Sequence, residues 1–187
     1  MKKLFLCLII MVSGVCLGAQ TKYRGIVEGG YSILQDNKSG TSYHVSTIHG
    51  VKYGWLFVGG GIGIENNKID NDTYNPSASP DLLDSVPYIG LKTISTTSVP
   101  VFFDCRTMWD SHTVMPMLNL KAGISFGEAF GPFIEPGAGV RVRLHKAMAV
   151  SASVFGKVLY DPGLVTDVPP CEDGLFKHAG MRVAFEF

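Results

Sequence analysis

The end of the chain, from Ala179 to Phe187, alternates between apolar and polar positions with a period of two. The odd positions hold alanine, methionine, valine and phenylalanine, and the even positions hold glycine, arginine, alanine and glutamate. This period predicts a β-strand with one apolar and one polar face. Because the strand closes the chain on an aromatic residue and follows a secretory leader, we expect its apolar face to meet lipid. Arg182 and Glu186 would then face the inside of a barrel.

Seven further stretches show the same alternation. Each has about ten or more residues, which matches the roughly 9–11 residues of a tilted strand that crosses a bilayer. The stretches are Tyr23 to Ile33, Tyr43 to Tyr53, Trp55 to Glu65, Val99 to Trp109, Met117 to Phe126, Phe133 to Leu144 and Ala147 to Tyr160. The glycines of the third stretch suit a sharply curved wall, or make room for a large side chain opposite. The pattern predicts an all-β fold: an eight-stranded antiparallel up-and-down transmembrane β-barrel.

The connections between these stretches alternate in length. The second, fourth and sixth are tight turns at Gly54, Asp110 to Val114, and His145-Lys146. Long polar connections run from Asn66 to about Ser98 and from Asp161 to Glu172. Outer-membrane barrels have short periplasmic turns, longer external loops and an even number of strands. The alternation therefore predicts insertion from the periplasm, with both ends of the barrel domain on the periplasmic side.

The start of the chain has the three parts of a secretory signal peptide. A positive start at Lys2 and Lys3 precedes an apolar core from Leu4 to Val12 and an exit of small residues up to Ala19. The apolar core is shorter than the about 20 residues that a membrane-spanning helix needs. We expect residues 1–19 to be removed and residues 20–187 to form one outer-membrane β-barrel domain.

Charges of both signs lie on the polar faces of the strands. The chain has 16 Lys and Arg and 16 Asp and Glu, so removal of the two leader lysines leaves a formal charge of −2. Neither sign dominates, and we expect no nucleic-acid partner. A lumen of eight strands is just wide enough to be filled by side chains, and charges buried there must pair. The predicted lumenal charge network comprises Arg24, Glu28, Lys52, Asp104, Arg106, Lys121, Glu135, Arg141, Arg143, Lys157, Arg182 and Glu186.

A second candidate site is the acidic external stretch from Glu65, the last residue of the third predicted strand, to Asp84. Its acidic residues are Glu65, Asp70, Asp72, Asp81 and Asp84. Such an external loop could bind a divalent cation that bridges lipopolysaccharide, or a host or phage protein. It does not match the calcium-loop pattern of a fixed glycine and a terminal glutamate. The usual behaviour of long loops favours a solvated, variable segment.

The cysteines and histidines show no metal-binding pattern. Cys7 and Cys16 leave with the leader, Cys105 lies on the predicted lipid face, and Cys171 lies in the last external loop. Cysteines whose Cα atoms are more than about 7 Å apart cannot form a disulfide, so we expect two free thiols. The five histidines lack metal-ligand spacing. We therefore expect neither a bound metal nor a cofactor.

The leader, the eight alternating stretches and the terminal Arg-Val-Ala-Phe-Glu-Phe together resemble the small outer-membrane β-barrel protein family. This class contains the OmpA- and OmpX-type barrels. The resemblance implies that the barrel-assembly machinery reads the closing strand, with Met181, Val183, Phe185 and Phe187 as the assembly signal. It also implies a monomer embedded in outer-membrane lipid. Its role would be non-enzymatic and would serve membrane integrity, adhesion or interaction with a surface ligand through the external loops.

Two rival hypotheses come from other functional classes. A secreted, soluble, lipocalin-like barrel would bind a small apolar ligand and carry its apolar faces inside. A lipid A-modifying outer-membrane enzyme would need a histidine that activates a serine at one rim. His44 with Ser42, or with Ser32 across the first hairpin, is the best pair for that role. No nucleophile-elbow motif accompanies these residues, and we expect no enzymatic activity.

Overall fold

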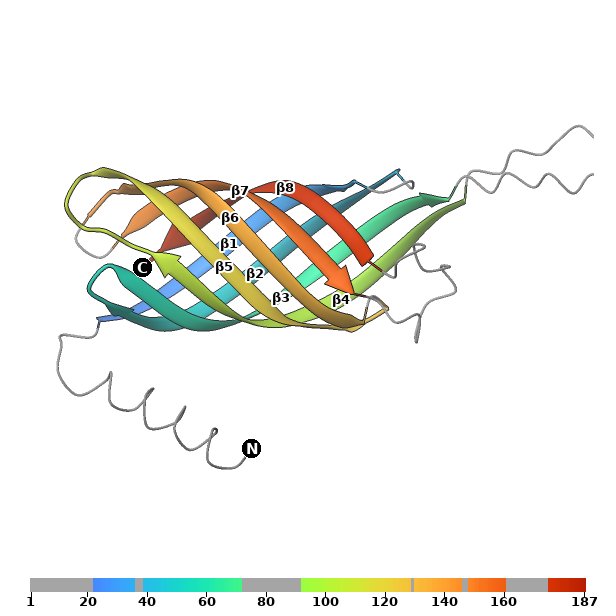
Figure 1. Cartoon of the computed structure of the whole chain (residues 1–187), viewed down its shortest axis with the longest axis horizontal. Helices are drawn as coiled ribbons and strands as arrows, with labels where there is room; N and C mark the ends of the chain where they lie inside the picture. The colour runs from blue at the N-terminus through green and yellow to red at the C-terminus, as the bar shows by residue number, and fades with distance from the viewer. Residues whose placement is uncertain (1–21, 36–38, 72–91, 129, 146–147, 161–174) are drawn as a thin grey trace, which may run out of the picture.

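Eight β-strands form the part of the protein that the structure describes (Figure 1). The computed structural model describes residues 22–35, 39–71, 92–128, 130–145, 148–160 and 175–187. The strands are β1 (Lys22–Leu34), β2 (Ser39–Tyr53), β3 (Leu56–Asn71), β4 (Lys92–Thr107), β5 (Val114–Gly127), β6 (Gly131–Arg143), β7 (Ala149–Tyr160) and β8 (Leu175–Glu186). Among the described residues, no helix is long and apolar enough to cross a membrane.

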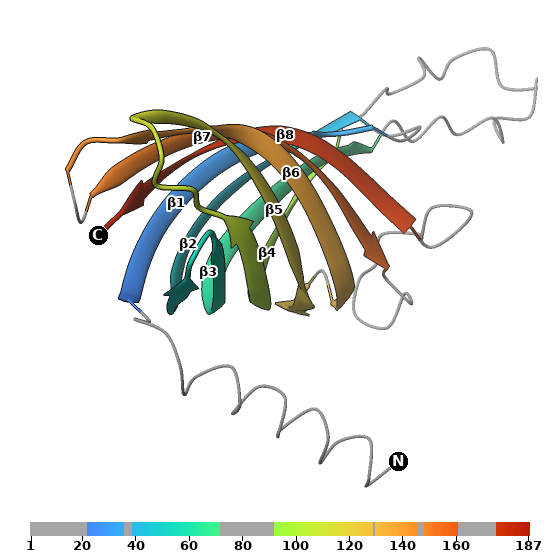
Figure 2. The same cartoon turned by 60° about the vertical axis from the view of Figure 1, so that its left-hand side comes forward.

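The sheet closes on itself because the first strand pairs with the last (Figure 2). All neighbouring strands are antiparallel, and β1 pairs with β8 from Ile26 opposite Glu186 to Leu34 opposite His178. Phe187 extends this pairing, since its backbone exchanges two hydrogen bonds of 2.9 Å with Gly25. Closure gives every strand a paired neighbour on both sides. The predicted eight-stranded antiparallel up-and-down barrel is confirmed.

The two sides of the barrel wall differ in chemistry. On β8, Arg182 and Glu186 point inward and are buried, whereas Met181, Val183 and Phe185 are exposed on the outside. The other strands follow the same rule, since the exposed large apolar side chains and the buried charged ones occupy alternate positions. The exterior is therefore apolar and the interior holds the charges. A barrel that carries a small apolar ligand in water would have the opposite arrangement.

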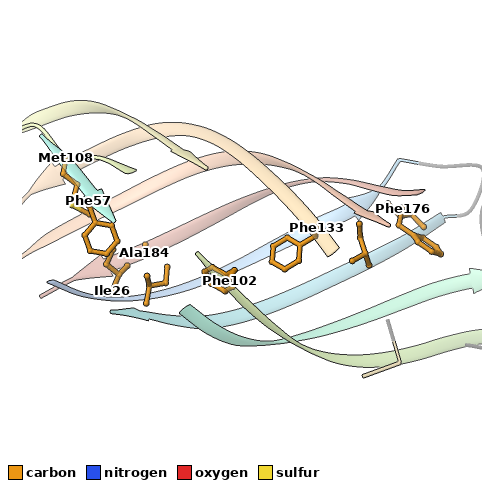
Figure 3. Packing of buried hydrophobic residues seen from close by; sticks show 10 residues of the cluster. Ile26, Phe57, Phe102, Met108, Phe133, Phe176 and Ala184 are labelled. Carbon is orange, nitrogen blue, oxygen red and sulfur yellow. The ribbon is translucent and has the colours of Figure 1, made fainter. Parts of the chain in front are cut away.

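Apolar side chains also occupy the interior, between the charged groups. Figure 3 shows them at successive places along the barrel: Ile26, Phe57, Met108 and Ala184 toward one end, Phe102 further along, then Phe133 and Phe176. Glycines make room for the rings. A Cβ atom added at Gly61 would lie 2.6 Å from the ring of Phe102, and one added at Gly59 would lie 2.8 Å from that of Phe57. The glycines of β3 thus accommodate large side chains inside the barrel.

The hairpin of β3 and β4 is longer than the sequence pattern predicted. The stretch from Asn66 to Asn71 pairs with the stretch from Lys92 to Thr97, although both were predicted to be loop. The Asn66 side chain donates hydrogen bonds to Thr97 Oγ1 and Ser95 Oγ, at 3.2 and 3.3 Å. The prediction was wrong at both ends because backbone pairing between strands does not need apolar side chains. The rest of the predicted loop, residues 72–91, lies outside the described residues.

The tight connections lie at the end of the barrel that also holds Phe187 (Figure 1). The turn from β2 to β3 uses Gly54, whose φ of 55° lies in the left-handed region. Glycine adopts this region without the clash that a Cβ atom causes. The return from β4 to β5 runs through residues 108–113. These short turns match the connections predicted for the periplasmic side.

Replacing Gly54 by valine tests whether this backbone conformation matters to stability. We expect the variant to lose about 1–2 kcal/mol of unfolding free energy, because a β-branched residue is strained at positive φ. Equilibrium urea unfolding measures the loss. Gly60→Ala is the matched control, since Gly60 has no positive φ and a Cβ atom there meets nothing within 4 Å. Equal stabilities of the two variants would contradict the expectation.

Candidate functional site: the charged lumen

Glu28 is the centre of the largest group of charges inside the barrel. Its carboxylate accepts hydrogen bonds from Arg106 Nη2 at 2.7 Å, from Ser46 Oγ at 2.9 Å and from Lys121 Nζ. Arg182 Nη1 lies 3.7 Å from the same carboxylate. The residue is only 1% exposed. A single acidic side chain on β1 thereby contacts side chains from β2, β4, β5 and β8.

The partners of Glu28 bind further acidic residues. Arg106 donates through Nε to Asp104, and Arg182 donates through Nη1 to Glu135. Lys121 Nζ also lies 3.4 Å from Glu135. Three acidic and three basic residues make up this central cluster, so its formal charge is zero. Burying charges is costly unless each finds an opposite charge and hydrogen bonds. Every charge of this cluster lies beside an opposite charge, whereas Asp104 Oδ1 and Arg182 Nη2 have no hydrogen-bond partner among the described residues.

A smaller pair lies farther along the lumen, on the side away from the tight turns. Lys157 Nζ donates a hydrogen bond to Glu65, and Ser42 Oγ donates a second one of 3.0 Å to the same carboxylate. All three side chains are buried. The pair is again balanced in charge, so no net charge accumulates at this level of the barrel.

A third group lies at the end that carries the tight turns. Arg141 binds Glu186 in a forked geometry, with Nη2 at 2.6 Å and Nε at 3.0 Å from the carboxylate. Such bidentate pairs are among the stronger charge-assisted contacts. Lys52 Nζ donates a 2.5 Å hydrogen bond to Asp110, and Arg141 Nη1 lies 3.6 Å from that carboxylate. Two acidic residues are therefore paired with two basic ones at this end.

Phenylalanine rings separate and cover the basic groups. Lys121 Nζ lies 4.8 Å from the ring centre of Phe102, and Lys157 Nζ lies 4.9 Å from that of Phe133. The guanidinium of Arg182 lies 4.9 Å from the ring centre of Phe155. A cation over an aromatic face is attracted by the ring's quadrupole. Each of the two inner groups of charges therefore has an aromatic cover as well as its acidic partners.

The structure brings most of the predicted lumenal residues together, with one correction. Eleven of the twelve have buried side chains that point inward, Arg24 among them. Arg143 is the exception, because it lies at the rim and donates a 2.7 Å hydrogen bond to the backbone carbonyl of Asp110. Asp110 itself was interpreted only as part of a turn. Asp110 follows the fourth predicted strand directly, at the end of the barrel where the strands of Lys52 and Arg141 also reach their tight turns. That position was the signal that could have identified it.

The acidic external loop requires a second correction. Glu65 belongs to β3 and its carboxylate is buried inside the barrel against Lys157, so it is not part of an exposed loop. Asp70 also belongs to β3 by its backbone pairing with Thr93. Asp72, Asp81 and Asp84 lie outside the described residues. Within the described part of the chain, no group of three or more potential metal ligands could hold an ion.

The serine–histidine pair of the enzyme hypothesis does not form. Ser42 gives its hydroxyl hydrogen to Glu65, so it is not activated by His44. The His44 ring packs edge-on against Phe155 at 5.4 Å, and its Nε2 atom has no hydrogen-bond partner among the described residues. Ser32 is buried opposite Ser42 in the first hairpin, whereas His44 lies opposite Gly30. In the described part of the chain, the predicted residues are therefore not arranged as a serine nucleophile with His44 as its base.

The remaining candidates lie on the outer wall. Cys105 is a free thiol exposed on β4, while Cys171 lies outside the described residues. The predicted assembly signal consists of four residues whose side chains are all exposed on the outside: Met181, Val183 and Phe185 on β8, and Phe187 directly after it. The ring of Phe187 stacks near that of Phe185, with centres 6.3 Å apart.

Fold and interior together define a class of protein: a closed eight-stranded antiparallel β-barrel with an apolar exterior and a charged interior. No protein-family model matches the chain, and no curated protein sequence matches it. Among solved structures it is similar to Neisserial surface protein A, with a TM-score of 0.52 and 7% sequence identity. The match covers 90% of this chain and 98% of that protein. At this identity the similarity is one of fold.

Replacing Glu28 by glutamine tests the role of the central cluster. The change leaves Arg106, Lys121 and Arg182 with one negative charge fewer in a buried site. Removing one partner of a buried charge pair costs about 3–5 kcal/mol, and we expect a loss of that size in equilibrium unfolding. Glu128→Gln is the control, because Glu128 is exposed and its neutral amide can still accept the hydrogen bond from Thr97 N. A Glu28 variant as stable as this control would refute the idea.

Asp110 at the rim predicts a dependence of stability on pH. Partial burial raises the pKa of Asp110, but the hydrogen bond and charge of Lys52 and the charge of Arg141 outweigh it and hold the pKa below the ordinary 3.8. A lowered pKa stabilises the fold above pH 3.8, and this contribution is lost as the pH falls through the folded-state value. The side chain is 48% exposed, so solvent screening keeps the contribution below about 1 kcal/mol.

Urea unfolding of the protein and of Asp110→Asn at pH 7 and pH 3 measures this contribution. We expect the protein to be the more stable of the two at pH 7, and the difference to shrink at pH 3. Glu128→Gln again serves as the control for loss of an exposed carboxylate. A difference that stays the same at both pH values would show that the Asp110 charge does not contribute.

Proposed function

We propose that this chain is an integral, monomeric outer-membrane β-barrel protein of the small class that includes the OmpA- and OmpX-type barrels. Its role is non-enzymatic, and it serves membrane integrity, adhesion or surface interaction through external loops. The observation that carries the proposal is the inverted wall, with large apolar side chains outside and paired charges inside. A closed barrel satisfies every strand's backbone hydrogen bonds, which a lipid environment requires.

The exterior supports a lipid environment more strongly than an aqueous one. Monomeric soluble proteins rarely expose contiguous apolar patches larger than a few hundred Å². Here exposed apolar side chains continue around all eight strands, including Ile64 on β3, Phe103 on β4 and Val154 on β7. A soluble lipocalin-like barrel would instead have to bury an apolar ligand among the charged groups around Glu28. The rival hypothesis therefore conflicts with the chemistry of both faces.

Aromatic residues gather at both edges of this apolar band. Trp55 and Trp109 stack with ring centres 6.1 Å apart at the end with the tight turns. Tyr31 and Tyr43 contact one another at 5.0 Å toward the opposite end, where Tyr160 is also exposed. Girdles of aromatic residues at both interfaces are typical of outer-membrane barrels. Their positions support a barrel that crosses the bilayer.

The interior supports a barrel without an open diffusion path. Charged groups and phenylalanine rings alternate along the lumen, and the ion pairs of each cluster join equal numbers of acidic and basic residues. We infer that paired side chains fill the lumen. Function would then reside in the surface that the barrel presents and in its contribution to the membrane. The exposed apolar residues of β8, with Phe187, support recognition by the barrel-assembly machinery.

Fractionation of cells that express the chain with its leader tests the proposed location. We expect the protein in outer membranes, resistant to a carbonate wash, and with different gel mobility before and after heating, because a closed barrel resists unfolding in detergent. A signal-peptide deletion that keeps the chain in the cytoplasm is the control. A soluble periplasmic or secreted protein would contradict the proposal.

A charged side chain placed on the outer wall tests whether lipid or water surrounds the barrel. Val154 is 59% exposed in the middle of β7, and arginine at the bilayer midplane costs about 2–4 kcal/mol. We expect Val154→Arg to lose about that much in unfolding from lipid vesicles. Leu144→Arg is the matched control, because Leu144 is exposed at the turn end, where the cost falls to about 0–1 kcal/mol. Two equally stable variants would indicate water on the outside.

A further inference from the structure

A groove crosses the outer wall of the barrel over strands β2 to β5. Its volume is about 480 Å³. Gly60 faces outward at its centre, and a Cβ atom added there would meet nothing within 4 Å. Phe103, opposite Gly60 on β4, is 77% exposed and forms one side. Ile62, Val101 and Ile124 continue the apolar lining.

Three polar side chains form a connected group at the β2 side of this groove. The Tyr23 hydroxyl and His49 Nδ1 are 2.5 Å apart, and Thr47 Oγ1 and His49 Nε2 are 3.1 Å apart. The rings of Tyr23 and His49 are nearly parallel, at 20°. Thr47 and His49 line the groove themselves. These groups lie on the outer face, where most of the other side chains that line the groove are apolar.

A count of hydrogens shows that this group has a donor to spare. A neutral imidazole has one N–H, and each hydroxyl has one O–H, so the group has three donor hydrogens. Its two contacts use two of them. Whichever tautomer His49 adopts, either the Tyr23 or the Thr47 hydroxyl keeps a hydrogen that can be donated outward. A protonated imidazole would leave two. In an apolar environment an unused donor is costly, so it favours a ligand with an acceptor oxygen.

We propose that this groove binds one acyl chain of an ester-linked glycerophospholipid, whose ester carbonyl accepts the spare hydrogen of the Tyr23–His49–Thr47 group. The proposal rests on the proposed membrane location. One lipid molecule supplies both an apolar chain for the groove and an acceptor for the donor. The volume of the groove falls within the about 300–1,000 Å³ of ordinary ligand sites.

The position of the polar group favours a lipid of the periplasmic leaflet. Tyr23 is the second residue of β1 and lies opposite Val51, close to the Gly54 turn. That turn is on the proposed periplasmic side, where the outer membrane has phospholipid. From there the groove continues toward Phe126, near the far end of β5. The ester group would therefore lie near His49, with the acyl chain directed toward the centre of the bilayer.

Native mass spectrometry of the mature barrel in mild detergent tests the proposal without any variant. The two probes are palmitoyl-oleoyl phosphatidylglycerol and its diether analogue, which keeps the chains and headgroup but lacks both carbonyls. We expect one ester lipid to bind about three- to tenfold more tightly than the diether, as expected for one additional hydrogen bond. Equal affinities for the two lipids would overturn the assignment of the carbonyl.

Three variants separate the contribution of the groove from that of the polar group. Gly60→Leu fills the groove, has room for its side chain, and is expected to weaken binding of both probes at least tenfold. Ala152→Leu adds the same side chain to the exposed wall of β7, on the opposite side of the barrel, and should bind as the unchanged protein does. The triple variant Tyr23→Phe, Thr47→Val, His49→Phe removes all three donors and should bind both probes equally.

The outcomes distinguish a specific groove from a general layer of lipid. If Gly60→Leu binds the ester lipid as tightly as Ala152→Leu does, the groove is not the site and the inference fails. If the triple variant still prefers the ester lipid, the spare donor is not responsible and the inference also fails. Carbonate-wash fractionation of the same variants is a separate measurement. A membrane-inserted barrel without the lipid preference would refute this site and leave the proposed function intact.

Discussion

The pairing of β1 with β8 is the constraint on which the rest of the structure depends. Once Ile26 lies opposite Glu186 and Phe187 bonds to Gly25, the sheet has an inside and an outside, and side chains at alternate positions must belong to one or the other. The period-two alternation of each strand then assigns the side chains of the whole barrel to its inside or its outside. Charges that would be solvated on an open sheet become enclosed, and apolar side chains that would collapse together are spread over the exterior.

Enclosure explains the order found in the lumen. A charge inside a narrow barrel must find its opposite within reach, and the groups around Glu28, Glu65 and Glu186 each do so with balanced charge. Phenylalanine rings between these groups fill space that water would otherwise occupy. They also cover the basic side chains. Because most partners come from different strands, the pairs also connect opposite walls. The interior is thus both a source of rigidity and the reason for proposing a barrel without an open path.

The exterior of the described strands is mostly apolar, and the polar group of Tyr23, His49 and Thr47 on it is informative for that reason. Tyr23, His49 and Thr47 satisfy most of one another's hydrogen bonds, which limits the cost of placing them on an apolar wall. Their spare donor lies beside a groove that exists because Gly60 has no side chain. The inward glycines of the same strand make room for Phe57 and Phe102. One glycine-rich strand therefore shapes both faces of the wall.

The sequence by itself determined the strand number, the up-and-down order and the face on which each side chain lies, because a period of two and short turns are local properties. It also placed opposite charges such as Arg182 and Glu135 on a common inner surface. It did not determine which charges meet: Glu65 ended a predicted strand but was also counted in the external acidic stretch, Arg143 was assigned to the lumen, and Asp110 had no role. Strand stagger and barrel tilt decide those contacts, and they bring together residues from different strands. Only the tertiary structure could therefore show that Glu28 lies at the centre, or that Tyr23 reaches His49.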